Sequence, residues 1–348
     1  MESMTYIGLD LHKRSISYCV KTASGKIVDE GTLASSRMTL VEWAEELPGP
    51  WVGAMEATIF TGWVYDALLP YASGLSVGHP PMLKAICCSK KKGDKIDARK
   101  LADLLRCDLF PECTMLPKAT RDLRRVLRFR NQVVRQLVRM KNTISGLLME
   151  SGQSYSKRKL HGKRYFAELL ANLEDVPAAV LELLGLSHGA MEFFSSMQKE
   201  LVAGLVAQPL LRERVALLMT IPGVGEITAL TWALEVGDPG RFGSVREAIS
   251  YCGLCSAHRE SGGKEYRGPI SKQRNKHLQT MLVEAAKIAP QWSEALRAIR
   301  DRERMRGHHN RATLVVARKL VSYLLAVDRR GTGFETSASR AGGEVRAA

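Results

Sequence analysis

The stretch that decides the fold is residues 5–33, TYIGLDLHKRSISYCVKTASGKIVDEGTL. Short runs in which apolar and polar residues alternate, rich in Ile, Val and Tyr, are typical of β-strands. Three such runs lie at 6–9, 15–20 and 26–33, and the turn signal Ala23-Ser24-Gly25 separates the last two. We therefore expect three consecutive strands joined by tight turns.

The segments that follow alternate between helical and strand patterns. A helical spacing over about 40–46 precedes a strand at 51–55 that runs into Glu56, and a helix at 62–70 precedes a short strand at 75–78. Three strands followed by alternating helices and strands predict a mixed α/β sheet of the ribonuclease-H type. We expect this first domain to cover residues 1–115.

A long basic helix is expected next, over about 118–150. It carries nine Lys or Arg residues and a single acid between 118 and 149, with its apolar residues spaced for one face. After a polar, basic break at 151–164, a second helical block covers about 166–206, with an interruption near 185–189. Two long helices joined by a loop predict an antiparallel coiled-coil arm over 116–208, and such arms commonly dimerise.

The remaining chain predicts a mainly helical C-terminal domain over 209–328, followed by a flexible tail over 329–348. The motif IPGVG at 221–225 lies between two helical runs and resembles the hairpin of a helix-hairpin-helix element. Beyond it we expect a helix at 244–252, a polar stretch at 255–276, and helices at about 277–289, 292–304 and 311–327.

Composition narrows the class of protein. The 348 residues suggest two domains and a connector, and 51 Lys and Arg against 36 Asp and Glu give a net charge of +15, which indicates a polyanionic partner. A hydrophobic content of 45% excludes a mainly disordered chain. Aromatic residues make up only 6%, so duplex DNA or structured RNA fits better than stacking on single-stranded bases.

The cellular compartment is inferred from what the sequence lacks. Apolar stretches such as 178–186 are broken by charge and are shorter than the roughly 18 residues of a membrane helix. The first ten residues do not resemble a signal peptide. The seven cysteines are odd in number and scattered, so we expect reduced thiols and a cytoplasmic, nucleoid-associated protein without a membrane partner.

Four carboxylates are candidates for a metal centre. Asp10 ends the first strand and Glu56 ends the fourth, while Asp94 and Asp97 are three residues apart at the start of a helix and project from the same side. Crowded carboxylates repel unless cations neutralise them, and two Mg²⁺ ions could grip the attacking and leaving oxygens of a phosphodiester. The alternative is that Asp10 is a turn residue and that Asp94 and Asp97 only complement a helix dipole.

Three segments that carry these acids resemble a known family. YIGLDLHK around Asp10, MEAT around Glu56, and GDKIDAR with Asp94 and Asp97 are similar to the Asp-Glu-Asp-Asp signature of IS-one-ten type bacterial insertion-sequence transposases. One departure is Ile59, where the family usually has glycine. The resemblance implies a RuvC-like N-terminal domain whose Asp10, Glu56, Asp94 and Asp97 bind Mg²⁺, with Mn²⁺ as a possible substitute.

The C-terminal half carries further segments of the same resemblance, from IPGVG through YCGL at 251–254, RESGG at 259–263 and YRG at 266–268 to RNKHL at 274–278. The resemblance implies that Ser261 is the nucleophile that joins covalently to DNA. A hydroxyl needs a base or a metal to activate it. Without the resemblance, a serine in ESGG would be interpreted as a turn residue.

Several residues are candidates for contacts with phosphate. Gly223 and Gly225 could offer backbone N–H groups at a helix N-terminus, or could simply be packing glycines in a tight helix–helix turn. The basic candidates around the serine are Arg259, Lys264, Arg267, Lys272, Arg274 and Lys276, and those on the long helix are Arg124, Arg128 and Arg135.

Two further features have competing interpretations. Cys252 and Cys255 have the spacing of a zinc knuckle, with His258 three residues on, but no second pair is nearby, so a buried thiol is the simpler interpretation of Cys252. His12 could approach the metal site, although a role at the surface of the strand end is the simpler expectation.

The resemblance therefore predicts a transposase that cleaves and rejoins DNA by metal-assisted attack of Ser261, with a phosphoserine intermediate. Because the acids and the serine lie in different domains, two protomers of a homo-oligomer could build the complete site. The resemblance also implies an element-encoded bridge RNA as a guide. The rivals are a RuvC-like metal-dependent endonuclease that uses water, and a non-catalytic nucleic-acid-binding protein.

Overall fold

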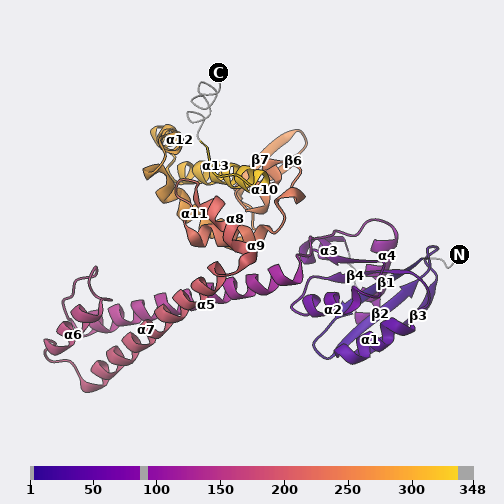
Figure 1. Cartoon of the computed structure of the whole chain (residues 1–348), viewed down its shortest axis with the longest axis horizontal. Coiled ribbons are helices and arrows are strands. Elements are labelled where there is room, and N and C mark those ends of the chain that lie inside the picture. Colours follow the sequence, from indigo (N-terminus) through magenta and orange to yellow (C-terminus); the bar gives the residue numbers. More distant parts are fainter. Residues whose placement is uncertain (1–3, 87–92, 336–348) are drawn as a thin grey trace. The chain divides into compact units, whose positions relative to one another are not determined.

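A computed structural model describes residues 4–86 and 93–335 of the chain (Figure 1). Contacts between residues divide the chain into two units, Met1–Lys118 and Ala119–Ala348. Within the described residues, no helix combines the length and the apolar character that crossing a bilayer requires.

The first unit is built on a five-stranded mixed sheet in the order β3-β2-β1-β4-β5. Its strands are β1 (Thr5–Leu11), β2 (Ser15–Lys21), β3 (Ile27–Ala34), β4 (Trp51–Glu56) and β5 (Gly74–Gly78). The first three pair antiparallel, whereas β1 and β4, and β4 and β5, pair parallel. The mixed α/β sheet predicted from the sequence is confirmed.

Helices cover both faces of this sheet. Side chains alternate between faces along β1, so Ile7 and Leu9 enter the core formed with α1 (Arg37–Glu46) and α2 (Thr61–Leu68). Gly8 and Asp10 belong to the opposite face, where α4 (Asp94–Arg106) packs across β1. A short helix α3 (Pro80–Ile86) was not expected after the proline pair, but proline is favoured in the first turn of a helix.

The second unit begins with the long helices α5 (Lys118–Glu150) and α7 (Ala178–Val206), with the shorter α6 (Lys163–Ala171) between them. Figure 1 shows α5 and α7 side by side, as expected for an antiparallel arm. The three helices share one apolar core, in which Ile144 and Leu148 of α5 pack with Phe166 of α6 and with Leu184 and Met191 of α7. This shared core holds together the part of the arm that lies away from Leu127 and Leu205, which belong to the core of the C-terminal helices.

The break expected within the second helical block lies elsewhere. α7 runs without interruption through Gly185 and Gly189, and the chain leaves helical structure between Ala171 and Ala178 instead. Two helical glycines cost only about 1 kcal/mol each, and the buried residues of α7 beside them offset that cost. Pro177 explains the true break, because it precedes the first turn of α7 and cannot continue a helix from α6.

The rest of the second unit is mainly helical, as expected. Its helices are α8 (Pro209–Met219), α9 (Glu226–Val236), α10 (Val245–Tyr251), α11 (Lys276–Ile288), α12 (Glu294–Met305) and α13 (His309–Arg330), with 3₁₀ turns η1 (Pro239–Arg241) and η2 (Ala289–Gln291). α9 is central, since nearly all of its residues are buried in the core of this region. α13 extends to Arg330, and residues 336–348 of the expected tail lie outside the described residues.

A hairpin replaces part of the polar stretch expected at 255–276. β6 (Ser256–Ser261) and β7 (Lys264–Ile270) pair antiparallel around Gly262 and Gly263, whose φ angles are 57° and 72°. Two consecutive residues with positive φ form the turn that best suits a two-residue hairpin, and glycine adopts them without strain. Ser261 is therefore the last strand residue before a tight turn.

Candidate active site

The sheet and one helix bring four carboxylates to one end of the first unit. Asp10 is the penultimate residue of β1, and Glu56 is the last residue of β4, the parallel neighbour of β1. Asp94 and Asp97 lie in the first turn of α4, which crosses the face of β1 to which Asp10 belongs. The positions expected for all four acids, at two strand ends and one helix start, are found.

A glycine sets the distance between α4 and β1. A Cβ atom on Gly8 would lie 2.0 Å from the carbonyl oxygen of Ala98 and 2.6 Å from the backbone nitrogen of Ala102. No side chain fits in that space, so the helix backbone rests directly on the strand. This contact holds the helix that carries Asp94 and Asp97 against the strand that carries Asp10.

Ion pairs fix the same helix from the side. Arg99 donates two hydrogen bonds to the Glu30 carboxylate of β3, at 2.6 and 2.5 Å, and Lys21 of β2 donates to Asp103 at 2.5 Å. The Lys21 side chain is 7% exposed and the Asp103 side chain 44%, so the ammonium end of this second bond is shielded from solvent. Together the two pairs attach α4 to β2 and β3.

Asp10 and Asp94 lie at short range around His12, whereas Glu56 and Asp97 do not belong to this closest group. The His12 Nε2 atom lies 3.1 Å from Oδ2 of Asp10 and 3.5 Å from Oδ1 of Asp94. One oxygen or nitrogen atom of each of these three residues lies within 4.8 Å of the others, a spacing that a single cation could span. Lys100 Nζ lies 3.1 Å from Oδ1 of Asp97 and holds this carboxylate within the same turn.

The electrostatics fit a cation site. Burial raises the pKa of Asp10, and the charges of Asp94 and Asp97 raise it further, while His12 opposes the rise. Burial also raises the pKa of Glu56, with contributions from the charges of Asp10 and Asp97. Carboxylates that disfavour their own ionisation are stabilised by a bound cation, so the donor set fits a hard divalent ion such as Mg²⁺.

The hairpin presents Ser261 to solvent. The Ser261 side chain is exposed, and Ser261 pairs directly with Lys264 across the turn, so both side chains belong to the same face of the ribbon. Lys272 and Lys276 are exposed further along the chain, and exposed Arg274 donates to the backbone oxygen of Ser271 at 2.9 Å. The side chains of His258, Arg259 and Arg267 lie outside the described residues.

The two glycines of IPGVG differ in their surroundings. Gly223 has a φ of 82°, and a Cβ there would lie 2.4 Å from Cβ of Ala289, so packing and turn geometry explain this glycine. Gly225 precedes the first turn of α9 with an extended backbone, and no atom lies within 4 Å of where its Cβ would stand. Space for an anion therefore exists at Gly225 rather than at Gly223.

The three arginines expected to contact phosphate on α5 have different environments. Arg135 is exposed. Arg128 forms a double hydrogen bond, at 2.7 Å each, with fully buried Glu235 of α9. Arg124 is partly buried beside Arg128, and burial together with that neighbouring charge lowers its pKa. No local sequence pattern predicts the ion pair of Arg128, because its partner Glu235 lies 107 residues away in the chain.

The cysteine pair does not have the character of a zinc site. Cys252 is fully buried, and burial raises the pKa of its thiol to about 12. A structural zinc site needs four ligands, and among the described side chains no group of three His, Cys, Asp or Glu ligands gathers around Cys252 and Cys255. The buried-thiol interpretation of Cys252 thus agrees with the structure.

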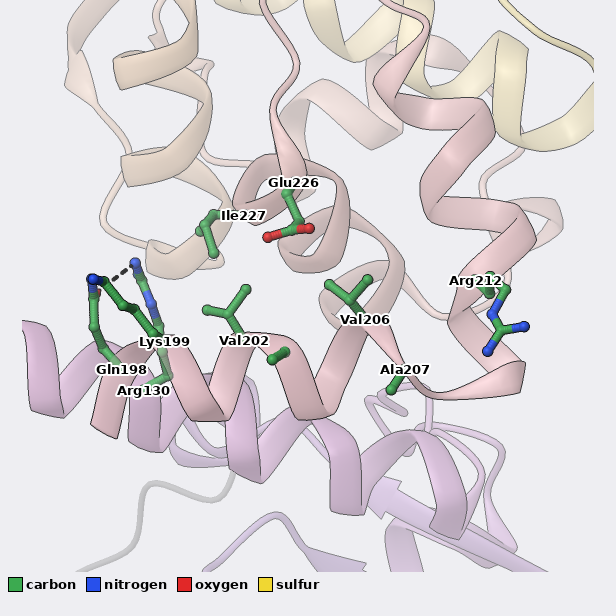
Figure 2. Close-up of a pocket in the computed structure, with 10 residues that line it drawn as sticks. Arg130, Gln198, Lys199, Val202, Val206, Ala207, Arg212, Glu226 and Ile227 are labelled. Atoms are coloured by element: carbon green, nitrogen blue, oxygen red, sulfur yellow. Dashed lines mark hydrogen bonds between the residues drawn. The ribbon is translucent and has the colours of Figure 1, made fainter. Parts of the chain in front are cut away.

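A concave surface missed by the sequence analysis lies between the root of the arm and α9. It encloses about 720 Å³ and combines apolar residues of α7 with the basic residues Arg130, Lys199 and Arg212. Figure 2 shows Val202 and Val206 on α7 facing Ile227 of α9, with Arg212 at one end. Gln198 accepts a hydrogen bond from Arg130 at 3.1 Å at the other end (Figure 2).

Two family models match the sequence. One, described as "Transposase" and specific to the Asp-Glu-Asp-Asp group of IS110, matches residues 7–152. The other, described as "Transposase IS116/IS110/IS902 family", matches residues 215–300. The first match includes all four carboxylates, and the second includes the hairpin with Ser261.

Several relatives are similar over much of the chain. The transposase for insertion sequence element IS1328 of Yersinia enterocolitica is 25% identical over 338 residues, which cover 96% of this chain and 99% of that protein. The transposase for IS1111A of Coxiella burnetii is 24% identical over 82% of this chain and 78% of its own length. A putative transposase of Sinorhizobium fredii is 29% identical over 217 residues, 61% of this chain, and the match spans about half, 53%, of that protein.

Proposed function

Since the chain belongs to the IS110 family of insertion-sequence transposases, we propose that it cuts and rejoins DNA with a metal centre in its first unit and a serine in its second. The metal ligands would be the four carboxylates Asp10, Glu56, Asp94 and Asp97. The observation that carries this proposal is their convergence on one end of the sheet, where burial and mutual charge raise the pKa values of Asp10 and Glu56.

Divalent ions bound there would neutralise phosphodiester charge and make a hydroxyl more acidic. Ser261 is the proposed nucleophile because it is exposed, next to a tight turn, and beside Lys264, whose ammonium group can hold the phosphate. In the proposed step, a bond forms between Oγ of Ser261 and phosphorus as the bond from phosphorus to a deoxyribose oxygen breaks. The serine proton ends on the released oxygen, and attack by another strand's hydroxyl reverses the step.

The nucleic-acid partners are part of the proposal. Exposed cations at Lys264, Lys272, Lys276 and Arg135, together with the net charge of +15, support contacts with a phosphate backbone. We propose double-stranded DNA as substrate, in the bacterial cytoplasm, and a structured RNA encoded by the element as guide. The first unit is balanced, with 14 Lys and Arg against 14 Asp and Glu, so the whole excess of +15 belongs to the second unit. An excess of that size along one segment supports a long polyanion rather than a small ligand.

A homo-oligomer is also proposed. α7 exposes several large apolar side chains, with Leu183, Leu186 and Phe193 exposed by 49%, 64% and 60%. A row of such residues on an arm suits burial against a second copy. An oligomer would allow acids of one copy and the serine of another to form one site.

The test is a covalent adduct. The protein is incubated with labelled donor and target DNA, Mg²⁺ and the non-coding RNA that flanks its gene, and protein–DNA adducts are resolved under denaturing conditions. We expect an adduct that is lost in Ser261→Ala and kept in Ser271→Ala. Ser271 is a matched control, because its hydroxyl accepts a hydrogen bond from the Gln273 backbone and lies at the far end of the same hairpin.

The two rival functions predict different results. Nicked DNA without an adduct, equally in both serine variants, would indicate an endonuclease that uses water. Binding of DNA with no cleavage product in the native protein, and unchanged behaviour of Asp10→Asn, would indicate a non-catalytic nucleic-acid-binding protein.

A further inference from the structure

His12 occupies a position among the acids that the Asp-Glu-Asp-Asp signature does not explain. It lies in the turn between β1 and β2, where its backbone N–H donates to the oxygen of Ser15 at 2.9 Å. This bond holds the start of the turn, and the imidazole lies beside Asp10 at the end of β1. The side chain is 49% exposed, so the core does not fix it there.

The distances around its Nε2 atom are those of neighbouring metal ligands. Oxygen ligands of Mg²⁺ or a similar octahedral ion lie about 2.1 Å from the metal, which places adjacent ligand atoms about 3 Å apart. His12 Nε2 is 3.1 Å from one oxygen of Asp10 and 3.5 Å from one oxygen of Asp94. Little movement would be needed for the three atoms to bind one ion.

A simple hydrogen bond explains only part of this arrangement. Nε2 can carry at most one hydrogen, but it lies close to carboxylate oxygens of both Asp10 and Asp94. One N–H group cannot donate a well-aligned hydrogen bond to both of them. A divalent ion would satisfy the same two oxygens from the same place. The tautomer that carries the ring's hydrogen on Nδ1 would present the Nε2 lone pair to such an ion.

We propose that His12 is a nitrogen ligand of one metal ion and makes this centre selective for Mn²⁺ over Mg²⁺. Both ions take oxygen ligands, but Mn²⁺, as a transition-metal ion, accepts an imidazole nitrogen more readily than Mg²⁺ does. The inference rests on the proposed carboxylate centre and assigns it a metal preference that the four acids alone would not have.

The test measures metal binding by the full-length protein without DNA. Mn²⁺ is titrated and followed by electron paramagnetic resonance, and pulsed measurements detect coupling to a ¹⁴N nucleus. We expect nitrogen coupling in the native protein and its loss in His12→Gln, with Mn²⁺ affinity reduced about tenfold or more, as when a supporting group of a metal site is lost. Mg²⁺ affinity, from competition with Mn²⁺, should change little.

Controls separate the possible outcomes. His309→Gln makes the same change at an exposed helix residue and should leave the spectrum unchanged. Mn²⁺ that binds in an Asp10-dependent manner without nitrogen coupling would overturn the role of His12 and leave the proposed function standing. Absence of Mn²⁺ and Mg²⁺ binding that depends on Asp10 would overturn the metal centre and this inference with it. Circular dichroism confirms that each variant is folded.

Discussion

At the scale of single residues, Gly8 decides whether the acids can meet. The absence of a side chain lets the backbone of α4 lie on β1, with Ala98 O only 2.0 Å from the place of a Cβ. Glycine in a strand usually weakens it, because it packs nothing and has more freedom to lose. Here that cost is offset by the close approach of a helix that carries two of the four carboxylates.

We predict that Gly8→Ala separates α4 from the sheet. Overpacking typically costs about 1–3 kcal/mol, and a clash with backbone atoms belongs at the upper end. Thermal unfolding should show the loss of stability, and Mn²⁺ titration a weaker site. Gly74→Ala is the control, since its Cβ would meet only Val52 of the same sheet at 3.6 Å. Equal behaviour of the two variants would contradict the role of Gly8.

The raised pKa of Asp10 implies that its ionised carboxylate, which metal binding would need, lowers the stability of the metal-free fold. Its pKa is raised above the ordinary value of 3.8, chiefly by burial, so ionisation destabilises the folded state. Below that value the carboxyl is protonated in folded and unfolded chains alike, and no penalty exists. As the pH rises through the raised pKa, the penalty develops in full.

We therefore predict that Asp10→Asn stabilises the metal-free protein at neutral pH by about 0.5–2 kcal/mol while it abolishes activity. The advantage should disappear below about pH 4 and shrink when Mn²⁺ is added to both proteins. Unfolding temperatures measured in EDTA across the acidic to neutral pH range check this prediction, with Glu42→Gln on the exposed face of α1 as a control. A variant less stable than the native protein at neutral pH would refute it.

At the scale of elements, Glu235 joins the arm to the C-terminal helices. Burial alone would raise its pKa, but the paired guanidinium of Arg128 and the amide of Asn275 together lower it, so the group stays charged. Asn275 also accepts hydrogen bonds from the first backbone N–H groups of α11, and Tyr251 of α10 donates to the backbone oxygen of Glu235. Glu235, through its carboxylate and its backbone oxygen, thus connects α5, α9, α10 and α11.

We predict that Glu235→Ala destabilises the second unit by about 3–5 kcal/mol, because it leaves the partly buried charge of Arg128 without its partner. Urea unfolding followed by circular dichroism gives the change in free energy. The surface pair Arg164–Glu168 on α6, exposed by 93% and 55%, is the matched comparison. Glu168→Ala should cost about 0.5 kcal/mol or less. Similar costs for the two variants would exclude the proposed role of Glu235.

The helices and strands also show which elements can be predicted from sequence patterns and which cannot. The strands and the long α5 were predicted closely, because each buries one face and its apolar residues repeat with the period of the element. The hairpin β6–β7 was missed since its residues are mostly exposed and carry no such period; its only local signal is the Gly262-Gly263 pair. The break in the second helical block was placed at 185–189 instead of before Ala178, because glycine was weighted above Pro177.

In the candidate site, too, local patterns predict the positions of single residues but not the contacts between distant segments. Local patterns made Asp10, Glu56, Asp94 and Asp97 candidates, because they end strands or start a helix. The family resemblance, and not the local pattern, favoured the metal-ligand interpretation over a turn residue and a helix-dipole contact. The contacts of His12 with Asp94, and of Arg128 with Glu235, join segments far apart in the chain. Only the packing of the folded chain brings such partners together.

At the scale of the whole molecule, the acids and the serine belong to different units of the chain. In the proposed homo-oligomer, to which the exposed apolar residues of α7 would contribute, one copy could supply the acids and another the serine. A site shared between copies would keep a lone protein from cutting the chromosome. Such a site also predicts that two differently inactivated copies can restore activity together.

We predict complementation between two inactive variants. Asp10→Asn and Ser261→Ala each lack one half of the site, and neither should form a DNA adduct alone. A mixture should recover about a quarter of native adduct formation if sites are shared by two copies that associate at random, because one such pairing in four joins an intact acid cluster to an intact serine. The adduct should contain only the Asp10→Asn chain, because that chain keeps the serine, and mass tags on the two proteins reveal which chain it is.

Adding Leu186→Glu and Phe193→Glu to both variants should abolish recovery and reduce the mass measured by light scattering, whereas Glu182→Gln on the same helix should not. No recovery from a mixture shown to contain mixed oligomers would mean that each copy acts with its own acids and its own serine.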